Sequence, residues 1–262
     1  MLFGMISAFA AIAVFAAEWR QSVTGVELDV RGLHITSLED IRAAIALTDS
    51  SNLASLDLLG VRRDIMSNPF IRDVELMRNP PKTLVVNVTE RTPIAMLINV
   101  QSKDWLVDQD GYVLPASSAP SMYDLPVITG VGKLRDLNPG VRITSSDVRR
   151  ALQALRTARA TDNDMLNVFS EINVSNKRDM ILYTMEAGVP IIFGPASQVE
   201  NKLRAFKAFW ENVAMKYDPT SLEYVDLRWK EQVVTRWRSS KHAPVVSVSP
   251  DTLVVDTLLT IH

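Results

Sequence analysis

The sequence predicts an α+β protein in which an N-terminal transmembrane helix precedes two folded units. Three observations support this class. The first 17 residues carry no charged side chain, residues 26–90 combine strand and helix periodicities, and a mixed region follows that ends in a strand-like run over 222–238. The chain of 262 residues, 47% hydrophobic and 22% charged, can bury a core. We therefore expect a transmembrane anchor at 1–20, a first unit at 23–92, a second unit at 93–238 and a C-terminal tail at 239–262.

The composition excludes several classes of function. The absence of cysteine removes thiol nucleophiles, disulfide frameworks and thiolate metal sites. The three histidines, at positions 34, 242 and 262, are scattered, and no G-x-S-x-G, H-E-x-x-H or dinucleotide-binding glycine motif occurs. A net charge of −2 argues against nucleic acid binding. We expect no enzymatic activity, cofactor, metal or nucleic acid partner.

The uncharged N-terminal segment predicts a single membrane span. A helix over 1–17 is about 26 Å long, and extension past Trp19 brings it close to the roughly 30 Å of a hydrocarbon core. Trp19 and Arg20 suit the membrane interface. The apolar residues expected to face lipid are Leu2, Phe3, Ile6, Phe9, Ile12, Val14, Phe15 and Trp19.

Two alternatives to an anchor stay open at the N-terminus. Ala16 and Ala17 suit a signal peptidase, so the segment also fits a cleaved signal peptide. A buried core helix is the second alternative. No positive residue precedes the apolar run, so charge counting leaves the orientation of a span undetermined.

The first unit predicts the element order β-α-α-β-β. Thr36 with Glu39 forms a capping-box pattern that predicts the start of the first helix, and Asn68-Pro69 ends the second. Such a unit is expected to place three strands in one sheet with both helices on one face. The expected elements are a strand over 26–30, a helix from 38 to 45, a helix from 55 to 67, and strands over 71–78 and 83–90.

The end of this unit carries a resemblance to a known family. The segment from Arg78 to Pro93, RNPPKTLVVNVTERTP, resembles the closing segment of the POTRA module in the bacterial cell-division family FtsQ/DivIB. Taken singly, its residues also have structural explanations, with Pro81 as a turn former and Glu90-Arg91 as a solvated pair. The residues that match the family pattern are Arg78, Pro81, Leu84, Val86, Val88, Glu90, Arg91 and Pro93.

The second unit predicts a mixed sheet with two helices. Ser145 is expected to cap the first helix, and Ser197 with Glu200 forms a second capping-box pattern before a long amphipathic helix. The Asp108-x-Asp-Gly segment lacks the bidentate glutamate of a calcium loop. The expected strands lie over 95–100, 105–107, 112–114, 125–129, 168–174, 180–185 and 189–193.

The run over 222–238, LEYVDLRWKEQVVTRWR, predicts one long edge strand. It resembles the segment of the FtsQ/DivIB β domain in which Y-V-D-L-R is followed by the region where the partner FtsB docks by adding a strand. Strand alternation places Trp229, Val233 and Trp237 on one face as an apolar ridge. Core packing of the two tryptophans is the alternative. The expected partner-binding residues are Tyr224, Trp229, Lys230, Val233, Val234, Arg236 and Trp237.

The resemblance to the FtsQ/DivIB family, which covers about residues 1–238, implies a function. It implies a non-catalytic divisome scaffold in the cytoplasmic (inner) membrane, with its bulk outside the cytoplasm at the division septum. The implied partners are FtsB, FtsL and components of the septal wall synthase. Two other hypotheses stay open: another POTRA-bearing envelope assembly or secretion component, and a secreted hydrolase released by signal cleavage.

Overall fold

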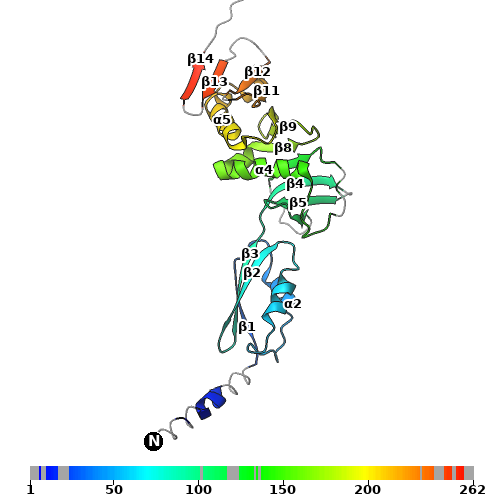
Figure 1. Ribbon diagram of the computed structural model, residues 1–262, viewed down its shortest axis with the longest axis vertical. Coiled ribbons are helices and arrows are strands. Elements are labelled where there is room, and N and C mark those ends of the chain that lie inside the picture. The colour runs from blue at the N-terminus through cyan, green and yellow to red at the C-terminus, as the bar shows by residue number, and fades with distance from the viewer. Residues whose placement is uncertain are drawn as a thin grey trace, which may run out of the picture. The chain divides into compact units, whose positions relative to one another are not determined.

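The computed structural model describes two compact units, which we treat separately. The first ends at Arg91 and the second begins at Thr92 (Figure 1). The residues that the structure describes are 6, 10–16, 24–100, 103–116, 124–132, 134, 137–230, 232–238, 245–249 and 252–256.

The first unit has the predicted β-α-α-β-β order. Among its described residues the strands form one sheet in the order β1-β3-β2, in which β1 runs parallel and β2 antiparallel to β3. The mixed α+β class and the POTRA-like order are therefore confirmed. The elements are β1 (Glu27–Arg31), α2 (Leu38–Ile45), α3 (Leu58–Ile65), β2 (Ile71–Asn79) and β3 (Thr83–Glu90).

The core of this unit lies between the helices and one face of the sheet. Alternation in β3 directs Leu84, Val86 and Val88 inward, where they meet Ile41 of α2 and Ile65 of α3. The predicted capping box is shifted by one residue. Ser37, and not Thr36, is the N-cap of α2, because its side chain accepts from the Asp40 N–H while the Asp40 carboxylate accepts from the Ser37 N–H.

Glu90, at the end of β3, is partly buried and anchors a loop of the same unit. Its carboxylate accepts three backbone N–H groups, from His34 (2.9 Å), Ile35 (2.8 Å) and Thr36 (2.8 Å). Gly32 makes this approach possible, since it has φ +86° and a Cβ there would lie 2.1 Å from the Val88 carbonyl oxygen. The last strand of the unit is thereby tied to the loop that precedes α2.

The second unit is built on one large mixed sheet. Within the described residues nine strands join in the order β12-β11-β10-β9-β8-β7-β4-β5-β6. The helices of this unit are α4 (Ser146–Thr161) and α5 (Val199–Asn212), with 3-10 turns at Asn163–Val168, Ala214–Lys216 and Pro219–Ser221. The strands are β4 (Pro93–Val100), β5 (Lys103–Asp108), β6 (Val113–Pro115), β7 (Val127–Thr129), β8 (Phe169–Asn173), β9 (Met180–Thr184), β10 (Pro190–Gly194), β11 (Leu222–Asp226) and β12 (Val234–Trp237).

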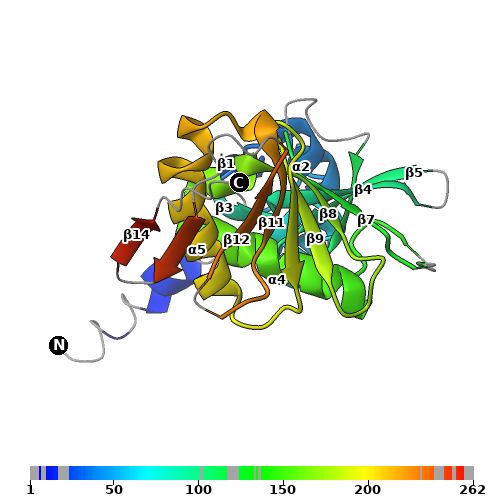
Figure 2. The ribbon, with the colours of Figure 1, turned by 90° about the horizontal axis from the view of Figure 1, so that it is seen from above.

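Helices α4 and α5 pack together and cover one face of this sheet (Figure 2). Phe169 of β8 and Phe206 of α5 lie with ring centroids 5.7 Å apart, and Trp210 continues the row at 5.5 Å from Phe206. These rings are among the largest buried side chains and fix α5 against the middle of the sheet. The strands near α5 are therefore held on a rigid support.

Two predictions about this unit are wrong. Ser197 and Glu200 form no capping box, because α5 begins at Val199 after Gln198, which adopts a left-handed conformation with φ +52° and makes no side-chain cap. The long edge strand over 222–238 is also wrong, since the chain forms two antiparallel strands, β11 and β12, joined by a loop. The Asp226 carboxylate accepts the Arg228 N–H at 3.0 Å, a turn that ends β11.

The segments at both ends of the chain are described in part. At the C-terminus, β13 (Val245–Ser249) and β14 (Thr252–Asp256) form an antiparallel pair that is separate from the large sheet. At the N-terminus, residues 10–16 are helical, and Ile12, Val14 and Phe15 are exposed, as is Ile6. Leu2, Phe3, Phe9 and Trp19 lie outside the described residues. The part of the chain that the structure describes holds no helix that meets the length and hydropathy of a membrane span.

Candidate functional site

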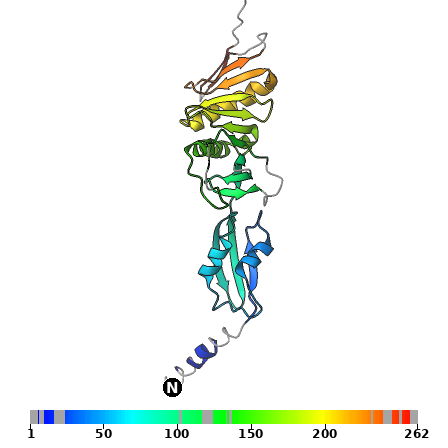
Figure 3. The ribbon, with the colours of Figure 1, turned by 90° about the vertical axis from the view of Figure 1, so that its right-hand side faces the viewer.

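The edge formed by β12 is the part of the second unit best suited to bind another chain. Arg238 donates its N–H to the Ser221 carbonyl at 2.8 Å, toward β11. Because successive residues of a strand point their N–H and C=O groups to opposite sides, Thr235 and Trp237 direct theirs away from β11. No described strand pairs with β12 on that side. The edge therefore offers backbone donors and acceptors to an incoming strand (Figure 3).

The two faces of β12 differ in character. Val233, just before the strand, is buried at 3% exposure, and Trp237 packs against the same core while its Nε1 donates to the Thr235 hydroxyl at 3.2 Å. Val234 is 37% exposed on the opposite face, and Arg236 pairs there with Glu223 of β11 at 3.0 Å. The inner face holds the strand in place and the outer face is available to solvent.

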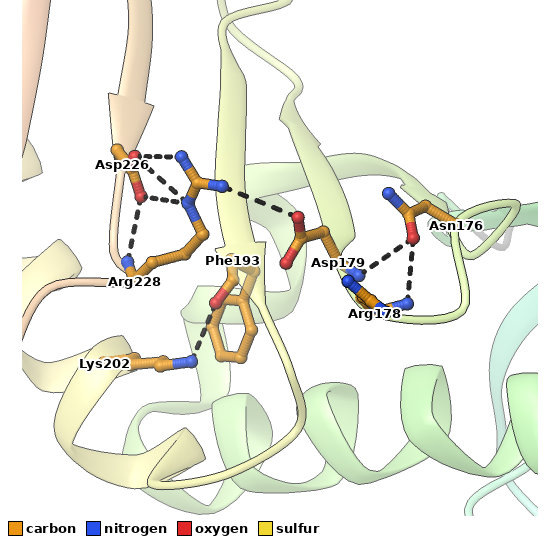
Figure 4. Close-up of polar contacts among 7 residues, drawn as sticks. All are labelled: Asn176, Arg178, Asp179, Phe193, Lys202, Asp226 and Arg228. Atoms are coloured by element: carbon orange, nitrogen blue, oxygen red, sulfur yellow. Dashed lines mark hydrogen bonds and ion pairs between the residues drawn. The ribbon is translucent and has the colours of Figure 1, made fainter.

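The loop after β11 is organised by an arginine between two carboxylates (Figure 4). Asp226 is 4% exposed and accepts from Arg228 in a forked arrangement, Oδ1 to Nε at 3.0 Å and Oδ2 to Nη2 at 2.7 Å. Asp179, in the turn before β9, lies 3.5 Å from Nη1 of the same guanidinium. A bidentate pair of this kind fixes the plane of the guanidinium as well as its position.

The charged state of this pair is favoured in the folded protein. Burial alone raises the pKa of Asp226, but hydrogen bonds from the Arg228 side chain and backbone outweigh it, so the pKa of Asp226 lies below its usual value. The same hydrogen bonds raise the pKa of Arg228. Both groups therefore stay ionised at neutral pH.

Two further residues shape the surroundings of the loop after β11. Gly194, at the end of β10, has φ +74°, and a Cβ there would lie 2.7 Å from Cγ of Arg228, so only glycine leaves room for the arginine stem. Lys202 of α5 donates to the carbonyl oxygen of Phe193 at 2.8 Å (Figure 4). It also donates to the carbonyl oxygen of Pro195 at 2.9 Å, and burial lowers the pKa of Lys202. These contacts tie the end of β10 to α5.

The structure separates the residues that the sequence placed on one ridge. Trp229 lies in the loop with 58% of its surface exposed, Val233 is in the core, and Trp237 is half-buried on β12. The predicted apolar ridge of these three residues is therefore wrong, because the loop interrupts the strand alternation on which it depended. Tyr224 is half-buried on β11, and Lys230 is exposed in the loop beside Trp229.

Sequence reasoning missed the polar cluster around Arg228. The pairing of Asp226 with Arg228 could have been inferred from the sequence. Residues two apart in a strand share a face, so an aspartate and an arginine at positions 226 and 228 are expected to lie together. Asp179 gave no such signal because it is distant in sequence. Across the described ranges, no group of three His, Cys, Asp or Glu residues could hold a metal ion.

Comparison with known proteins gives matches over both units. The family model described as "FtsQ/DivIB, C-terminal related" matches residues 92–236, more than half of the chain, and the model "POTRA domain, FtsQ-type" matches residues 27–91. The chain is 25% identical over 241 residues to "Cell division protein FtsQ" of Salinibacter ruber, covering 89% of this chain and 90% of that protein. It is 25% identical over 224 residues to "Cell division protein FtsQ" of Rhodothermus marinus, covering 83% and 79%. It is also 26% identical over 172 residues to "Cell division protein DivIB" of Clostridium tetani, covering 65% and 63%.

Proposed function

Because the chain belongs to the FtsQ/DivIB family of cell division proteins, we propose that it is a non-catalytic, membrane-anchored scaffold of the divisome. In this proposal the second unit binds the FtsB-FtsL pair and thereby connects early division proteins to septal wall synthesis. A tethered scaffold acts by raising the effective concentration of weakly associating partners. This role requires a docking surface and no reactive group.

The observation that carries the proposal is the open edge of β12. The outward N–H and C=O groups of Thr235 and Trp237 are suited to pair with a strand from FtsB, and the exposed Val234 lies beside them. Trp229, of which 58% is exposed, follows Arg228 in the same loop and is available as an aromatic contact. Tyr224, Lys230, Arg236 and Trp237 complete the proposed contact set.

The membrane anchor is also part of the proposal. Exposed apolar residues on the helix over 10–16, among them Ile12, Val14 and Phe15, are consistent with contact to lipid. The bulk of the chain is then extracytoplasmic, attached to the cytoplasmic membrane at the septum. N-terminal sequencing of the protein purified from membranes tests this, and a mature chain that begins near Glu18 contradicts it.

A proline substitution tests strand addition directly. Thr235→Pro removes the outward N–H of β12 and should reduce capture of the FtsB-FtsL pair by about 30-fold or more, as expected for a lost hydrogen bond plus a steric clash with the added strand. Thr235→Val is the matched control because it keeps the N–H, and it should bind as the unaltered chain does. Equal capture by both variants, with unchanged circular dichroism, places the interface elsewhere.

The burial of Val233 determines which side chains can be used in such tests. A charge at Val233 would disrupt the core, so a loss of binding there reports on folding. Val234→Asp on the exposed face is the appropriate substitution, and it should weaken capture without lowering the melting temperature. In dividing cells a fluorescent fusion should gather at midcell, and diffuse envelope fluorescence contradicts a divisome role.

A further inference from the structure

Helices α4 and α5 leave part of their positive charge unpaired. Together they contain three carboxylates, and each of these is bound by a cation of its own helix. Asp162, which follows α4, is bound by Lys207. No carboxylate of the two helices is therefore left for the other arginines of α4. The pairs within the helices are Asp147–Arg150 (3.1 Å), Glu200–Arg204 and Glu211–Lys207 (2.6 Å).

The other arginines of α4 are Arg149, Arg156 and Arg159. Among the residues that the structure describes, their guanidinium groups form no ion pair or hydrogen bond. Arg149 and Arg156 are exposed and lie two turns apart on one side of the helix, about 10.5 Å along its axis. The unpaired charge therefore forms a row along the exposed side of α4.

This row leads into a groove between the C-terminal half of α4 and the first turns of α5, helices that pack together (Figure 2). The groove has a volume of about 520 Å³, which lies within the range of ligand sites. Because Glu200 is neutralised by Arg204, Arg156 supplies the net positive charge of the groove. The residues that line it are Arg156, Thr157, Ala160, Thr161, Glu200 and Arg204.

The two threonines of the groove have already used their hydroxyl donors. Thr157 donates to the Gln153 carbonyl oxygen at 2.9 Å, and Thr161 donates to the Thr157 carbonyl oxygen at 2.8 Å. An anion that enters the groove therefore finds its donors on the Arg156 guanidinium, which has no internal partner to give up.

This combination favours an acidic peptide over other anions. A guanidinium binds a carboxylate through two parallel hydrogen bonds. Carboxylates three residues apart in an extended peptide, about 10 Å, can reach Arg156 and Arg149 together. Nucleic acid binding depends on many phosphate contacts, which two exposed arginines on a chain with a net charge of −2 do not supply. A flat lipid surface leaves a groove between two helices unfilled.

We propose that the groove between α4 and α5, extended by Arg149, is a docking surface for an acidic peptide segment of a partner protein. None of its residues belongs to β11, β12 or the loop between them. The inference therefore goes beyond the proposed function, because it gives the second unit another surface that can be occupied while the β12 edge is in use. A scaffold with two separate surfaces can hold two partners close together.

Removal of the unpaired charges tests the proposal. A fluorescein-labelled peptide of eight glutamates (octaglutamate) is titrated with the full chain in a zwitterionic detergent, and fluorescence anisotropy measures the affinity. Arg149→Gln with Arg156→Gln should weaken binding by about fivefold or more. Binding by the unaltered chain should also weaken as salt is added.

The matched control removes the same charge elsewhere. Arg42→Gln with Lys216→Gln replaces two exposed cations outside the groove and should bind octaglutamate as the unaltered chain does. Equal affinity of both double variants, whether lowered or unchanged, overturns the proposal. Absence of binding by the unaltered chain overturns it as well.

A substitution without a change of charge tests the groove itself. Ala160→Phe fills the groove with a ring and should weaken octaglutamate binding by about threefold or more. Asn167→Phe adds the same ring at an exposed position in the 3-10 turn after α4, outside the groove, and should have no effect. Circular dichroism should be the same for both variants. If both bind as the unaltered chain does, the groove is not used and the proposal fails.

Competition separates an acidic peptide from other anions. An oligothymidylate of eight nucleotides and glycerol phosphate, the headgroup of an anionic lipid, should each displace the labelled peptide less well than unlabelled octaglutamate. Better displacement by either one assigns the arginines to nucleic acid or lipid and overturns the proposal. Thr235→Pro should bind octaglutamate as the unaltered chain does, and a loss in that variant places the peptide at β12 and contradicts a separate surface.

Discussion

The two edges of the large sheet are closed in different ways. At β6, Val113 donates its N–H to the Val141 carbonyl at 2.9 Å and its carbonyl accepts the Gly140 N–H at 2.8 Å, so residues 140 and 141 satisfy the outward groups of Val113. At β12, no described residue forms backbone hydrogen bonds with the outward groups of Thr235 and Trp237. Val113 on one edge is thus bonded within the fold, whereas the outward groups of β12 have no backbone partner among the residues that the structure describes.

The difference between the two edges indicates which edge contributes to stability and which one is suited to binding. An open edge is a liability that folded proteins usually blunt, so its retention on one side only indicates a use for that side. The loop before β12 is correspondingly well anchored, since Arg228 is held by Asp226 and Asp179. The open edge is thus presented by a fixed loop and a buried inner face.

The largest expected effect comes from proline at the sealed edge. Val113→Pro removes the N–H bonded to Val141 and should lower the free energy of unfolding by about 2 kcal/mol or more, whereas Thr235→Pro at the open edge should cost less than about 1 kcal/mol. Chemical denaturation of both variants measures this contrast. Similar losses at the two edges would mean that β12 also has its outward groups bonded within the fold.

A smaller loss of stability is expected when the Asp226 carboxylate, which holds Arg228 in the loop, is replaced. Asp226→Asn keeps the shape but removes the charge that orients Arg228, and it should cost about 1–3 kcal/mol in the free energy of unfolding. Asp179→Asn is the control, with a smaller effect because its contact with Arg228 is 3.5 Å long. If the control costs as much as Asp226→Asn, the fork between Asp226 and Arg228 is not the main support of the loop.

The Asp226 carboxylate also leads us to expect that the stability of the protein depends on pH. The folded pKa of Asp226 lies below its unfolded value, so its contribution is fully present above about pH 4 and is lost as the pH falls through the folded pKa. Stability curves measured from pH 7 to pH 2 should show a decrease below about pH 4 that is weaker in Asp226→Asn. An unchanged decrease in that variant assigns the acid sensitivity to other carboxylates.

The smallest effect is expected at the surface of the open edge. Arg236 and Glu223 form an ion pair in which both side chains are largely exposed, so Arg236→Ala should change the free energy of unfolding by less than about 0.5 kcal/mol. Thermal melts at low and high salt measure it. A larger loss would show that the outer face of β12 contributes to the fold, contrary to the division between its two faces.

The sequence predicted the local elements well where periodicity and turn residues agree. The alternation of Leu84, Val86 and Val88 and the stop at Asn68-Pro69 correspond to a buried strand and the end of a helix. The capping boxes were harder because several Ser, Thr, Asp and Glu residues lie near each helix start, and the backbone conformation decides which one caps. Gln198, in a left-handed conformation, leaves Ser197 outside that position.

The candidate site could be predicted only in outline. The run over 222–238 contains strands only at its two ends, β11 and β12, because alternation cannot detect that Asp226 ends β11 by accepting the Arg228 N–H. The resulting loop moves Trp229 into solvent and Val233 into the core. The order of strands in the large sheet depends on contacts between distant residues, and local patterns carry no information about it.

The parallel pairing of β1 with β3 has a mechanical consequence. The chain enters the first unit at the start of β1, Glu27, and leaves it after the end of β3, Glu90, and these points lie at opposite ends of the ladder. Tension between them therefore loads the ladder in shear, so its hydrogen bonds resist together and do not open one at a time. The three bonds from the Glu90 carboxylate to residues 34–36 add to this resistance. The first unit is therefore expected to resist a pull between its two ends through many hydrogen bonds at once.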